Sequence, residues 1–502
     1  MAVPFPDIPW LQGFDKPCRF EGEVRNLIVH GEVPKQLDGT FFRVMPDPHI
    51  SPSYHENGIH YIPFDGDGNV SAFRVKDGHV DFRQQYVKTE RLVKEREARQ
   101  SLWGRYQNPY TSHPCVRAAI ESTANTNVVY YHGNLLALKE YTLPYSLDPV
   151  TLETRGYWDF DGQISSRSFT AHPKVDPKTQ ELVCWGTQAK GPGTTDCCYF
   201  ALGPDGKKTE ECWFQNPFCG FLHDAGVSED YVALMLVPMR VDIEKMKKGG
   251  SHYYYDHDLD LHWGLVPRRG SDATKVRWFT WKNSFPTHTA NAYQEVGPDG
   301  EVEKVFVETV LAQGNVLPFF PEENRKDNSP TISNIKIQLV RFCFDLKAEV
   351  PTDGTYQRLS DPEVLLDLPC EFPRIDDRFT GQKQRFIFCA TAHVTGEPNS
   401  LSLVGSAGLN SYTMVDLSLG KVEHCLFGPN SLVQEPCFAP RSKDASEGDG
   451  FLIGLVNRLD TMLTEMVVID TKNFSKPVAV VEVGLRLRQG LHGNWVEASE
   501  ME

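Results

Sequence analysis

The sequence predicts an all-β protein, and within that class a seven-bladed β-propeller with a lid of loops and short helices over one face. Short β-branched or aromatic runs alternate with turns rich in Asp and Gly from about residue 60 to residue 485, and long helical periodicity is scarce. Sharing 502 residues among seven units gives about 72 each, enough for a four-stranded blade and one long loop. Two β-sandwich domains are the alternative, but no Pro/Gly/Ser-rich linker divides the chain.

The predicted hairpins follow one another along the whole chain. Clear examples are HYIPFDGDGNVSAFRV at residues 60–75, YFALGPDGKKTEECWF at 199–214 and MVVIDTKNFSKPVAVVEV at 466–483. In each, alternation supplies a buried face and Asp, Gly or Pro supplies the turn. Short helices are expected at 89–100 and 240–248. Residues 1–502 are therefore interpreted as one propeller domain, with lid segments at about 88–125, 237–275 and 313–335.

Composition excludes several classes of protein. The net charge of −16 disfavours nucleic acid as a partner. No apolar run is long enough for a transmembrane segment, and the first residues do not resemble a signal peptide, so a cytoplasmic location is expected. The twelve cysteines show no C-x-x-C spacing and are expected to be reduced.

Four of the sixteen histidines stand beside a strand-like run and a turn signal. Three are spaced roughly one blade apart and the last follows about three blades later, so equivalent blade ends would bring them to the propeller axis. Such a cluster would be a metal site with neutral ligands only. His257 and His262 in DHDLDLHW are interpreted as solvated, and His393 is rejected because no Pro follows it. The four candidates are His172, His223, His288 and His492.

The strings TAHP, LHDAGVSEDY, HTANAY and LHGNW, with FDGDG near the start, stand in a fixed order along the chain. Together they resemble the carotenoid cleavage oxygenase family, and within it the branch that cleaves stilbenes and phenylpropenes. The resemblance covers roughly residues 20 to 496. It implies a seven-bladed propeller with a non-haem Fe(II) on its axis, bound by the four histidines named above.

The same resemblance implies three glutamates behind the histidines. Glu140 in LALKEYTLPYSLDP would support His223, Glu371 in CEFPRID would support His288, and Glu435 in VQEPCFAP would support His492. Carboxylates in these positions offset the metal charge and fix the imidazole tautomer. His172 would have no carboxylate partner.

Four nitrogen ligands leave up to two adjacent positions open on an octahedral ion, where O2 or a substrate can bind. No dinucleotide-binding fingerprint occurs, and FDGDG is interpreted as a turn. The resemblance therefore implies a dioxygenase that uses O2 as co-substrate and needs no external reductant. Both oxygen atoms would end in the carbonyl groups of two products of a cleaved C=C bond.

The substrate class depends on two residues that also follow from the resemblance. Stilbene-cleaving relatives hold the 4-hydroxyl of the substrate with a Tyr and a Lys, and Tyr106 in LWGRYQNPY and Lys139 stand at the matching positions. An ammonium and a phenol group together would favour binding and ionising a phenol. Phe319, or its neighbour Phe320, in LPFFP is a further candidate for the pocket wall.

The predicted function is Fe(II)-dependent cleavage of 4-hydroxylated stilbenes or phenylpropenes, of the resveratrol, lignostilbene or isoeugenol type, to aromatic aldehydes. An apocarotenoid oxygenase is the alternative among enzymes, and a protein-interaction scaffold is the alternative outside them. The expected partner is a small aromatic substrate, and the sequence leaves the oligomeric state open.

Overall fold

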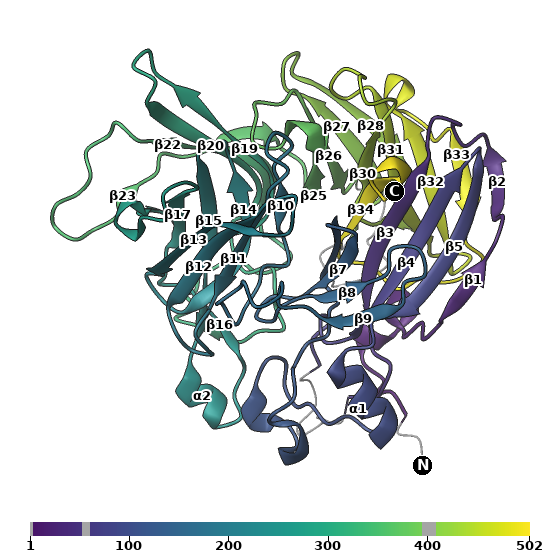
Figure 1. Cartoon of the computed structure of the whole chain (residues 1–502), viewed down its shortest axis with the longest axis horizontal. Helices are drawn as coiled ribbons and strands as arrows, with labels where there is room; N and C mark the ends of the chain where they lie inside the picture. The colour runs from purple at the N-terminus through teal and green to yellow at the C-terminus, as the bar shows by residue number, and fades with distance from the viewer. Residues whose placement is uncertain (1–3, 53–60, 394–407, 502) are drawn as a thin grey trace.

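The computed structural model describes residues 4–52, 61–393 and 408–501, which form seven separate hydrogen-bonded sheets (Figure 1). The fold is an all-β propeller, which confirms the predicted class. The first sheet contains β1 (Gly22–Val24), β3 (Gly39–Asp47), β4 (Asp67–Lys76), β5 (His79–Tyr86) and β34 (Gly493–Glu497). The second contains β6 (Asn127–Tyr131), β7 (Asn134–Leu138), β8 (Tyr145–Leu147) and β9 (Thr154–Tyr157).

The next three sheets follow in chain order. The third contains β10 (Lys174–Val175), β11 (Leu182–Thr187), β12 (Asp196–Leu202) and β13 (Lys208–Gln215). The fourth contains β14 (Gly220–Val227), β15 (Tyr231–Val241), β16 (Tyr253–Asp256), β17 (Leu261–Pro267), β18 (Arg277–Trp281), β21 (Glu322–Glu323) and β23 (Gln357–Arg358). The fifth contains β19 (Phe285–Val296), β20 (Val302–Ala312), β22 (Ile337–Asp345) and β24 (Glu363–Leu366).

The last two sheets complete the ring. The sixth contains β25 (Cys370–Arg374), β26 (Phe386–Thr391), β27 (Ser411–Asp416) and β28 (Lys421–Leu426). The seventh contains β2 (Ile28–Gly31), β29 (Ser431–Val433), β30 (Cys437–Pro440), β31 (Gly450–Arg458), β32 (Leu463–Asp470) and β33 (Ala479–Glu482). Strand pairs are antiparallel except β16 with β21 and β18 with β23.

Both ends of the chain take part in closing the ring. Near the N-terminus β2 pairs with β33 of the last sheet, and near the C-terminus β34 pairs with β3 of the first sheet. Figure 1 shows the consequence, with purple N-terminal strands beside yellow C-terminal ones. Each exchange covers a strand edge that would otherwise stay unpaired. The ends of the chain therefore hold the first and last sheets in a fixed relation.

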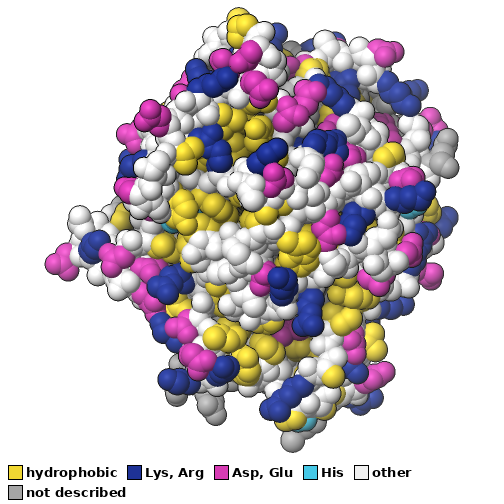
Figure 2. Space-filling view, turned by 60° about the vertical axis from the view of Figure 1, so that its left-hand side comes forward, with side chains coloured by type: hydrophobic (Ala, Val, Ile, Leu, Met, Phe, Trp, Pro, Cys, Tyr) yellow, Lys and Arg dark blue, Asp and Glu magenta, His cyan; other side chains and the backbone are white. Residues whose placement is uncertain are grey.

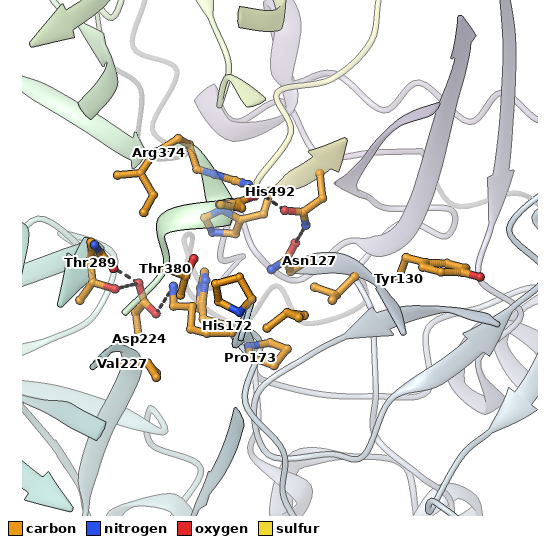
Figure 3. Close-up of a pocket in the computed structure, with 18 of the residues that line it drawn as sticks. Asn127, Tyr130, His172, Pro173, Asp224, Val227, Thr289, Arg374, Thr380 and His492 are labelled. Carbon is orange, nitrogen blue, oxygen red and sulfur yellow. Dashed lines mark hydrogen bonds and ion pairs between the residues drawn. The ribbon is translucent and has the colours of Figure 1, made fainter. Parts of the chain in front are cut away.

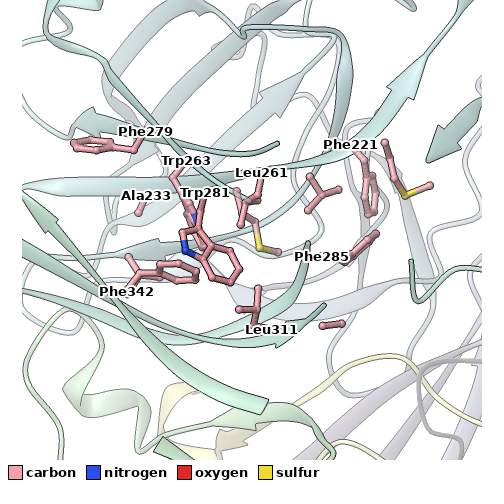
Figure 4. Packing of buried hydrophobic residues seen from close by; sticks show 14 of the residues in the cluster. Phe221, Ala233, Leu261, Trp263, Phe279, Trp281, Phe285, Leu311 and Phe342 are labelled. Atoms are coloured by element: carbon pink, nitrogen blue, oxygen red, sulfur yellow. The ribbon is translucent and has the colours of Figure 1, made fainter. Parts of the chain in front are cut away.

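Apolar side chains fill the space between neighbouring sheets. Trp263 of β17 and Trp281 of β18 pack against Phe342 of β22, with ring centroids 5.7 and 5.4 Å apart from that of Phe342 (Figure 4). All three side chains are buried. Burying one such side chain stabilises a fold by roughly 1.5–3 kcal/mol. This packing makes the fourth and fifth sheets a rigid support for the residues at their inner ends.

The two helices predicted from the sequence are confirmed, and both lie in connections between strands. α1 (Glu90–Ala98) begins where the Thr89 hydroxyl accepts a hydrogen bond from the Leu92 N–H, and α2 (Ile243–Lys247) has Asp242 as its N-cap. Among the described residues no helix is both long and apolar enough to cross a bilayer. Single 3₁₀ turns lie at Pro9–Leu11, Gly13–Asp15, Pro109–Thr111, Pro114–Val116, Ala273–Lys275, Asp377–Phe379, Thr471–Asn473 and Ala498–Glu500.

The loops that carry α1 and α2 lie on the same side of the sheets, at the bottom of Figure 1. Asn108 ties them together, because its side-chain amide donates to the carbonyls of Met246 and Gly250 over 2.9 and 2.7 Å. Asn108 is fully buried. Two of the three segments predicted to form a lid are therefore directly bonded to each other.

One sequence-based interpretation was wrong. His257 and His262 were expected to be solvated, yet both side chains are buried: His262 lies in the buried strand β17, and His257 lies beside Glu322 of another lid segment. His257 lies 3.3 Å from a carboxylate oxygen of Glu322.

The twelve cysteines are unpaired, as expected. Acidic and basic side chains are interspersed on the face shown in Figure 2.

Candidate metal centre

Four histidines from different parts of the chain meet in the interior. His172 lies just before β10, His223 in β14, His288 in β19 and His492 just before β34, so each stands at an edge strand of a different sheet. Their candidate ligand nitrogens all lie within 4.8 Å of one another. The Nε2 atom of His223 is 3.2 Å from that of His172 and 3.0 Å from that of His288. The structure thus brings together all four histidines predicted from the sequence.

Irregular strand pairing aims these side chains. The register of β14 against β15 shifts between Leu222 and Ala225, and that of β19 against β20 shifts between Pro286 and Thr289. His223 and His288 lie inside these irregularities. A β-bulge bends a strand and redirects a side chain, and bulges are enriched beside active sites. Regular strand pairing is therefore interrupted at the two positions that carry these histidines.

Three buried carboxylates hold the opposite ring nitrogens. The Nδ1 atom of His223 is 2.6 Å from Glu140, that of His288 is 2.9 Å from both oxygens of Glu371, and that of His492 is 3.1 Å from Glu435. The pairs are the three that the resemblance implied. An imidazole whose Nδ1–H donates to a carboxylate presents an unprotonated Nε2.

Two of these glutamates are followed by residues with unusual backbone angles. Tyr141, after Glu140, has φ of 73°, and Phe372, after Glu371, has φ of 54°. Positive φ is disfavoured for bulky side chains and is concentrated at functional sites. The two departures from regular strand geometry turn both glutamates toward their histidines.

The electrostatics of the cluster suit a cation. Burial, and then the neighbouring histidines, lower the pKa of His172 well below its usual value. Burial alone would raise the pKa of Glu140 and Glu435, but their histidine partners bring each to about 2. The site therefore combines ionised carboxylates with imidazoles whose lone pairs converge.

The donor set fits a bound metal ion. Two imidazole nitrogens, each about 2.1 Å from one ion and at a right angle, lie about 3 Å apart. The nitrogen separations of 3.0 and 3.2 Å are close to that value. Convergent lone pairs repel one another unless a cation lies between them. His172, His223, His288 and His492 are thus the residues that would hold the ion.

Aromatic side chains extend from the histidines toward the lid. Phe221 stacks on His223 with ring centroids 5.0 Å apart, and it also lies 5.0 Å from Tyr253. Tyr253 lies 5.3 Å from Phe320, which lies 6.1 Å from Tyr106. These contacts form a continuous aromatic wall between the metal centre and the second predicted group of site residues.

That second group is a buried Lys–Tyr pair. The ammonium of Lys139 donates to the Tyr106 hydroxyl over 2.9 Å, and its nitrogen lies 4.6 Å from the centroid of the same ring. The exposed fractions are 5% for Lys139 and 8% for Tyr106. Burial lowers the pKa of Lys139 below its usual value, although the nearby carboxylates of Glu140 and Asp65 act in the opposite direction. Both residues predicted to hold a phenol are in direct contact.

Two cavities flank the centre. The lid cavity, of about 300 Å³, is lined by Trp103, Tyr106, Lys139, Glu140 and Tyr141, among others. The axial cavity, of about 590 Å³, is lined by three of the four histidines and by polar residues such as Lys174, Asp224, Thr289 and Arg374 (Figure 3). Acidic and basic side chains line both cavities, but the wall of the lid cavity is the more apolar of the two.

Phe319 is the predicted site residue that the structure does not bring to these cavities. Its ring packs edge-on against Phe64, 5.3 Å between centroids, and beside Phe320. Sequence reasoning missed Phe221 and Tyr253. Phe221 was within reach, because residues two apart in a strand share a face and Phe221 precedes His223 by two. Tyr253 offered no such signal, since its place depends on how the lid segments pack.

The protein is therefore an all-β propeller, and it carries a buried site of four histidines of the kind that binds a metal ion. Residues 15–497 match the family model described as retinal pigment epithelial membrane protein. The chain belongs to this family, that of the carotenoid oxygenases.

Named relatives cover the whole chain. Resveratrol cleavage oxygenase 1 of Aspergillus fumigatus is 42% identical over 100% of this chain and 98% of its own length. Isoeugenol monooxygenase of Pseudomonas nitroreducens is 37% identical over 97% of this chain and 98% of its own. The crystal structure of Pseudomonas brassicacearum lignostilbene dioxygenase superposes with a TM-score of 0.90 at 38% identity, covering 99% of this chain and 100% of that one.

Proposed function

We propose that this protein is a non-haem Fe(II) dioxygenase that cleaves the alkene of 4-hydroxylated stilbenes or phenylpropenes to aromatic aldehydes. The observation that carries the proposal is the Lys139–Tyr106 pair, buried at one end of an aromatic wall that begins at His223. The names of the relatives, which concern resveratrol, isoeugenol and lignostilbene, support the same substrate class. In this proposal each sheet is one of seven blades and the ion lies on their shared axis.

Each group of residues has a task in the proposed reaction. When bound by the four histidines, Fe(II) supplies the redox chemistry that allows O2 to react with the alkene. Glu140, Glu371 and Glu435 keep the Nδ1 protons in place and so keep the Nε2 atoms free for the ion. The aromatic wall keeps water from the alkene. The products are two carbonyl compounds, and the carbonyl group of each takes one of the two atoms of O2.

Lys139 and Tyr106 act on the phenol. A 4-hydroxyl beside the Lys139 ammonium is favoured in its ionised form, because opposite charges attract strongly in a buried site. The phenolate passes electron density through the conjugated system to the alkene, which makes the alkene easier to oxidise. The segments at about 88–125, 237–275 and 313–335 form the lid that excludes solvent. The cytoplasmic location stays a prediction.

An apocarotenoid oxygenase has less support. A carotenoid chain has no para-hydroxyl for the Lys139–Tyr106 pair, and a buried ammonium facing an apolar polyene would cost free energy. A propeller that only binds other proteins has no need of three buried carboxylates behind four histidines.

The deciding experiment is anaerobic reconstitution with Fe(II), followed by exposure to air with resveratrol, isoeugenol and an apocarotenal in parallel. Aldehyde products are quantified by chromatography, with the 4-methyl ether of isoeugenol as a matched substrate. We expect turnover of the two phenols and near-background turnover of the ether. Preferred cleavage of the apocarotenal, or equal cleavage of isoeugenol and its ether, would overturn the assignment.

A further inference from the structure

The axial cavity reaches the metal centre and, within the part of the chain that the structure describes, shares no lining residue with the lid cavity. Three of the four imidazoles, those of His172, His288 and His492, lie on its wall. Among the described residues that line the lid cavity, none of the four imidazoles appears; that cavity reaches the centre only through Glu140. Of these two cavities, only the axial cavity has imidazoles of the cluster on its wall.

The wall of the axial cavity is suited to a small hydrated ion. It is formed largely by polar and charged groups, including Asp224 and Thr289, which follow histidines of the cluster, and Arg374 of β25 (Figure 3). Divalent cations bind oxygen ligands and keep part of their water shell on the way to a site. An apolar stilbene would instead have to strip these polar groups of water. The cavity thus fits an ion better than it fits the aromatic substrate.

Asp224 is held as a carboxylate on this wall. One of its oxygens accepts hydrogen bonds of 2.8 Å from both the N–H and the hydroxyl of Thr289. The other lies 2.9 Å from the ammonium of Lys174. The Asp224 side chain is 1% exposed and that of Lys174 is 25% exposed. The oxygen that faces Lys174 also accepts the Ala225 N–H over 2.7 Å. Because Lys174 reaches solvent, it can move away and leave the second lone pair of that oxygen to another cation.

We propose that the axial cavity is the passage by which a divalent metal ion reaches and leaves the four histidines. In this passage the Asp224 carboxylate binds the entering ion, after the Lys174 ammonium has moved away from it. The inference rests on the proposed function in one respect, namely that the histidines bind a metal. The lid cavity is the unfavourable route, since the buried ammonium of Lys139 faces it and repels cations.

A matched pair of alanines allows the two routes to be blocked separately. Ala290 lines the axial cavity and Ala119 lines the lid cavity, and both are partly exposed. Ala290→Trp and Ala119→Trp therefore add the same volume to one cavity each. Apoprotein is mixed with Co²⁺, and uptake is followed by stopped-flow visible absorbance. Release is followed after adding excess EDTA, so neither readout depends on activity.

We expect Ala290→Trp to slow both uptake and release at least tenfold and Ala119→Trp to leave both within twofold of the unchanged protein. Lys174→Met should speed uptake about threefold to tenfold at low ionic strength, because a like charge is removed from the path. Asp224→Asn should slow it. Circular dichroism and thermal melting check each fold, and Ala290→Leu serves as a smaller plug where the Trp variant is unstable.

Several outcomes would overturn the passage. Equal rates in the two Trp variants, or slowing only in Ala119→Trp, would place the route elsewhere. A higher KM for isoeugenol in Ala290→Trp with unchanged Co²⁺ rates would make the axial cavity a substrate site. Failure of the unchanged protein to bind Co²⁺ at all would instead contradict the metal site in the proposed function.

Discussion

The two ends of the site are built in different ways. At the histidine end, four side chains stand at strand edges of four sheets, and carboxylates fix three of them over 2.6 to 3.1 Å. At the lid end, Tyr106 comes from a loop that is held by side-chain hydrogen bonds such as those of Asn108. In the proposed function, a rigid scaffold positions the ion, and loops position the substrate. Changes at the two ends should therefore have separable effects.

The largest effect is expected from removing a ligand. His288→Ala deletes one of four imidazoles and leaves the Glu371 carboxylate without its partner. We expect loss of bound iron, measured by elemental analysis, and activity at background, with the propeller still folded by circular dichroism. A variant with normal iron content and turnover would remove His288 from the metal centre. His393→Ala, outside the cluster, is the control.

At the lid end, Lys139→Ala should act on the phenol and not on the ion. A hydrogen bond to a charged group contributes roughly 1.5–3 kcal/mol, or about 10- to 150-fold by the tenfold-per-1.4 relation. We expect kcat/KM for isoeugenol to fall by at least that factor, with iron content unchanged. The 4-methyl ether, which cannot ionise, should lose little. Equal losses for the two substrates would show that Lys139 serves the fold only.

A smaller effect is expected behind the ligands. Glu371→Gln keeps the shape of the side chain but removes the charge that faces His288. Losing such a partner typically costs about 10- to 100-fold in metal affinity or activity. Iron affinity, measured by competition with a chelator, should fall while the KM for isoeugenol changes little. Glu301→Gln, on the exposed side of a turn, should leave affinity unaltered. A similar fall in both variants would remove the special role of Glu371.

How much the sequence could predict also differs between the two ends. His172, His223, His288 and His492 could be recognised because each sits in a motif at a strand end, where local sequence determines position. The bulge that turns His223 inward carries no comparable signal, because it depends on the pairing with β15. On the lid side, prediction identified Tyr106 and Lys139 through the resemblance.

Residues whose neighbours come from distant loops were beyond sequence reasoning. Either Phe319 or Phe320 was expected to line the pocket; Phe319 packs on Phe64, and Phe320 contacts Tyr106. Adjacent aromatics in LPFFP are indistinguishable by composition, so only the loop geometry decides between them. His257 was misjudged for a related reason, since its partner Glu322 lies in another lid segment. Contacts between loops are set by tertiary packing and not by local pattern.

The smallest expected effect concerns a carboxyl group of the lid cavity. Burial raises the pKa of Glu121 from 4.5 to about 7, although Arg91 and Lys139 lower it. The folded protein therefore binds this proton more tightly than the unfolded chain. Below pH 4.5 the carboxyl group is neutral in both states and does not lower the free energy of unfolding. As pH rises toward 7, the free energy of unfolding falls, because the unfolded chain releases this proton first.

Glu121→Gln removes this titration and tests its sign. At pH 4 the variant should match the unchanged protein, and at pH 8 it should be more stable by about 1–3 kcal/mol, since each pKa unit corresponds to about 1.4 kcal/mol. Urea unfolding at both pH values measures the difference. Glu301→Gln should show no pH-dependent gain. If the variant and the unchanged protein differed by the same amount at both pH values, water would reach Glu121. The lid end would then be open to solvent, whereas the histidine end is closed.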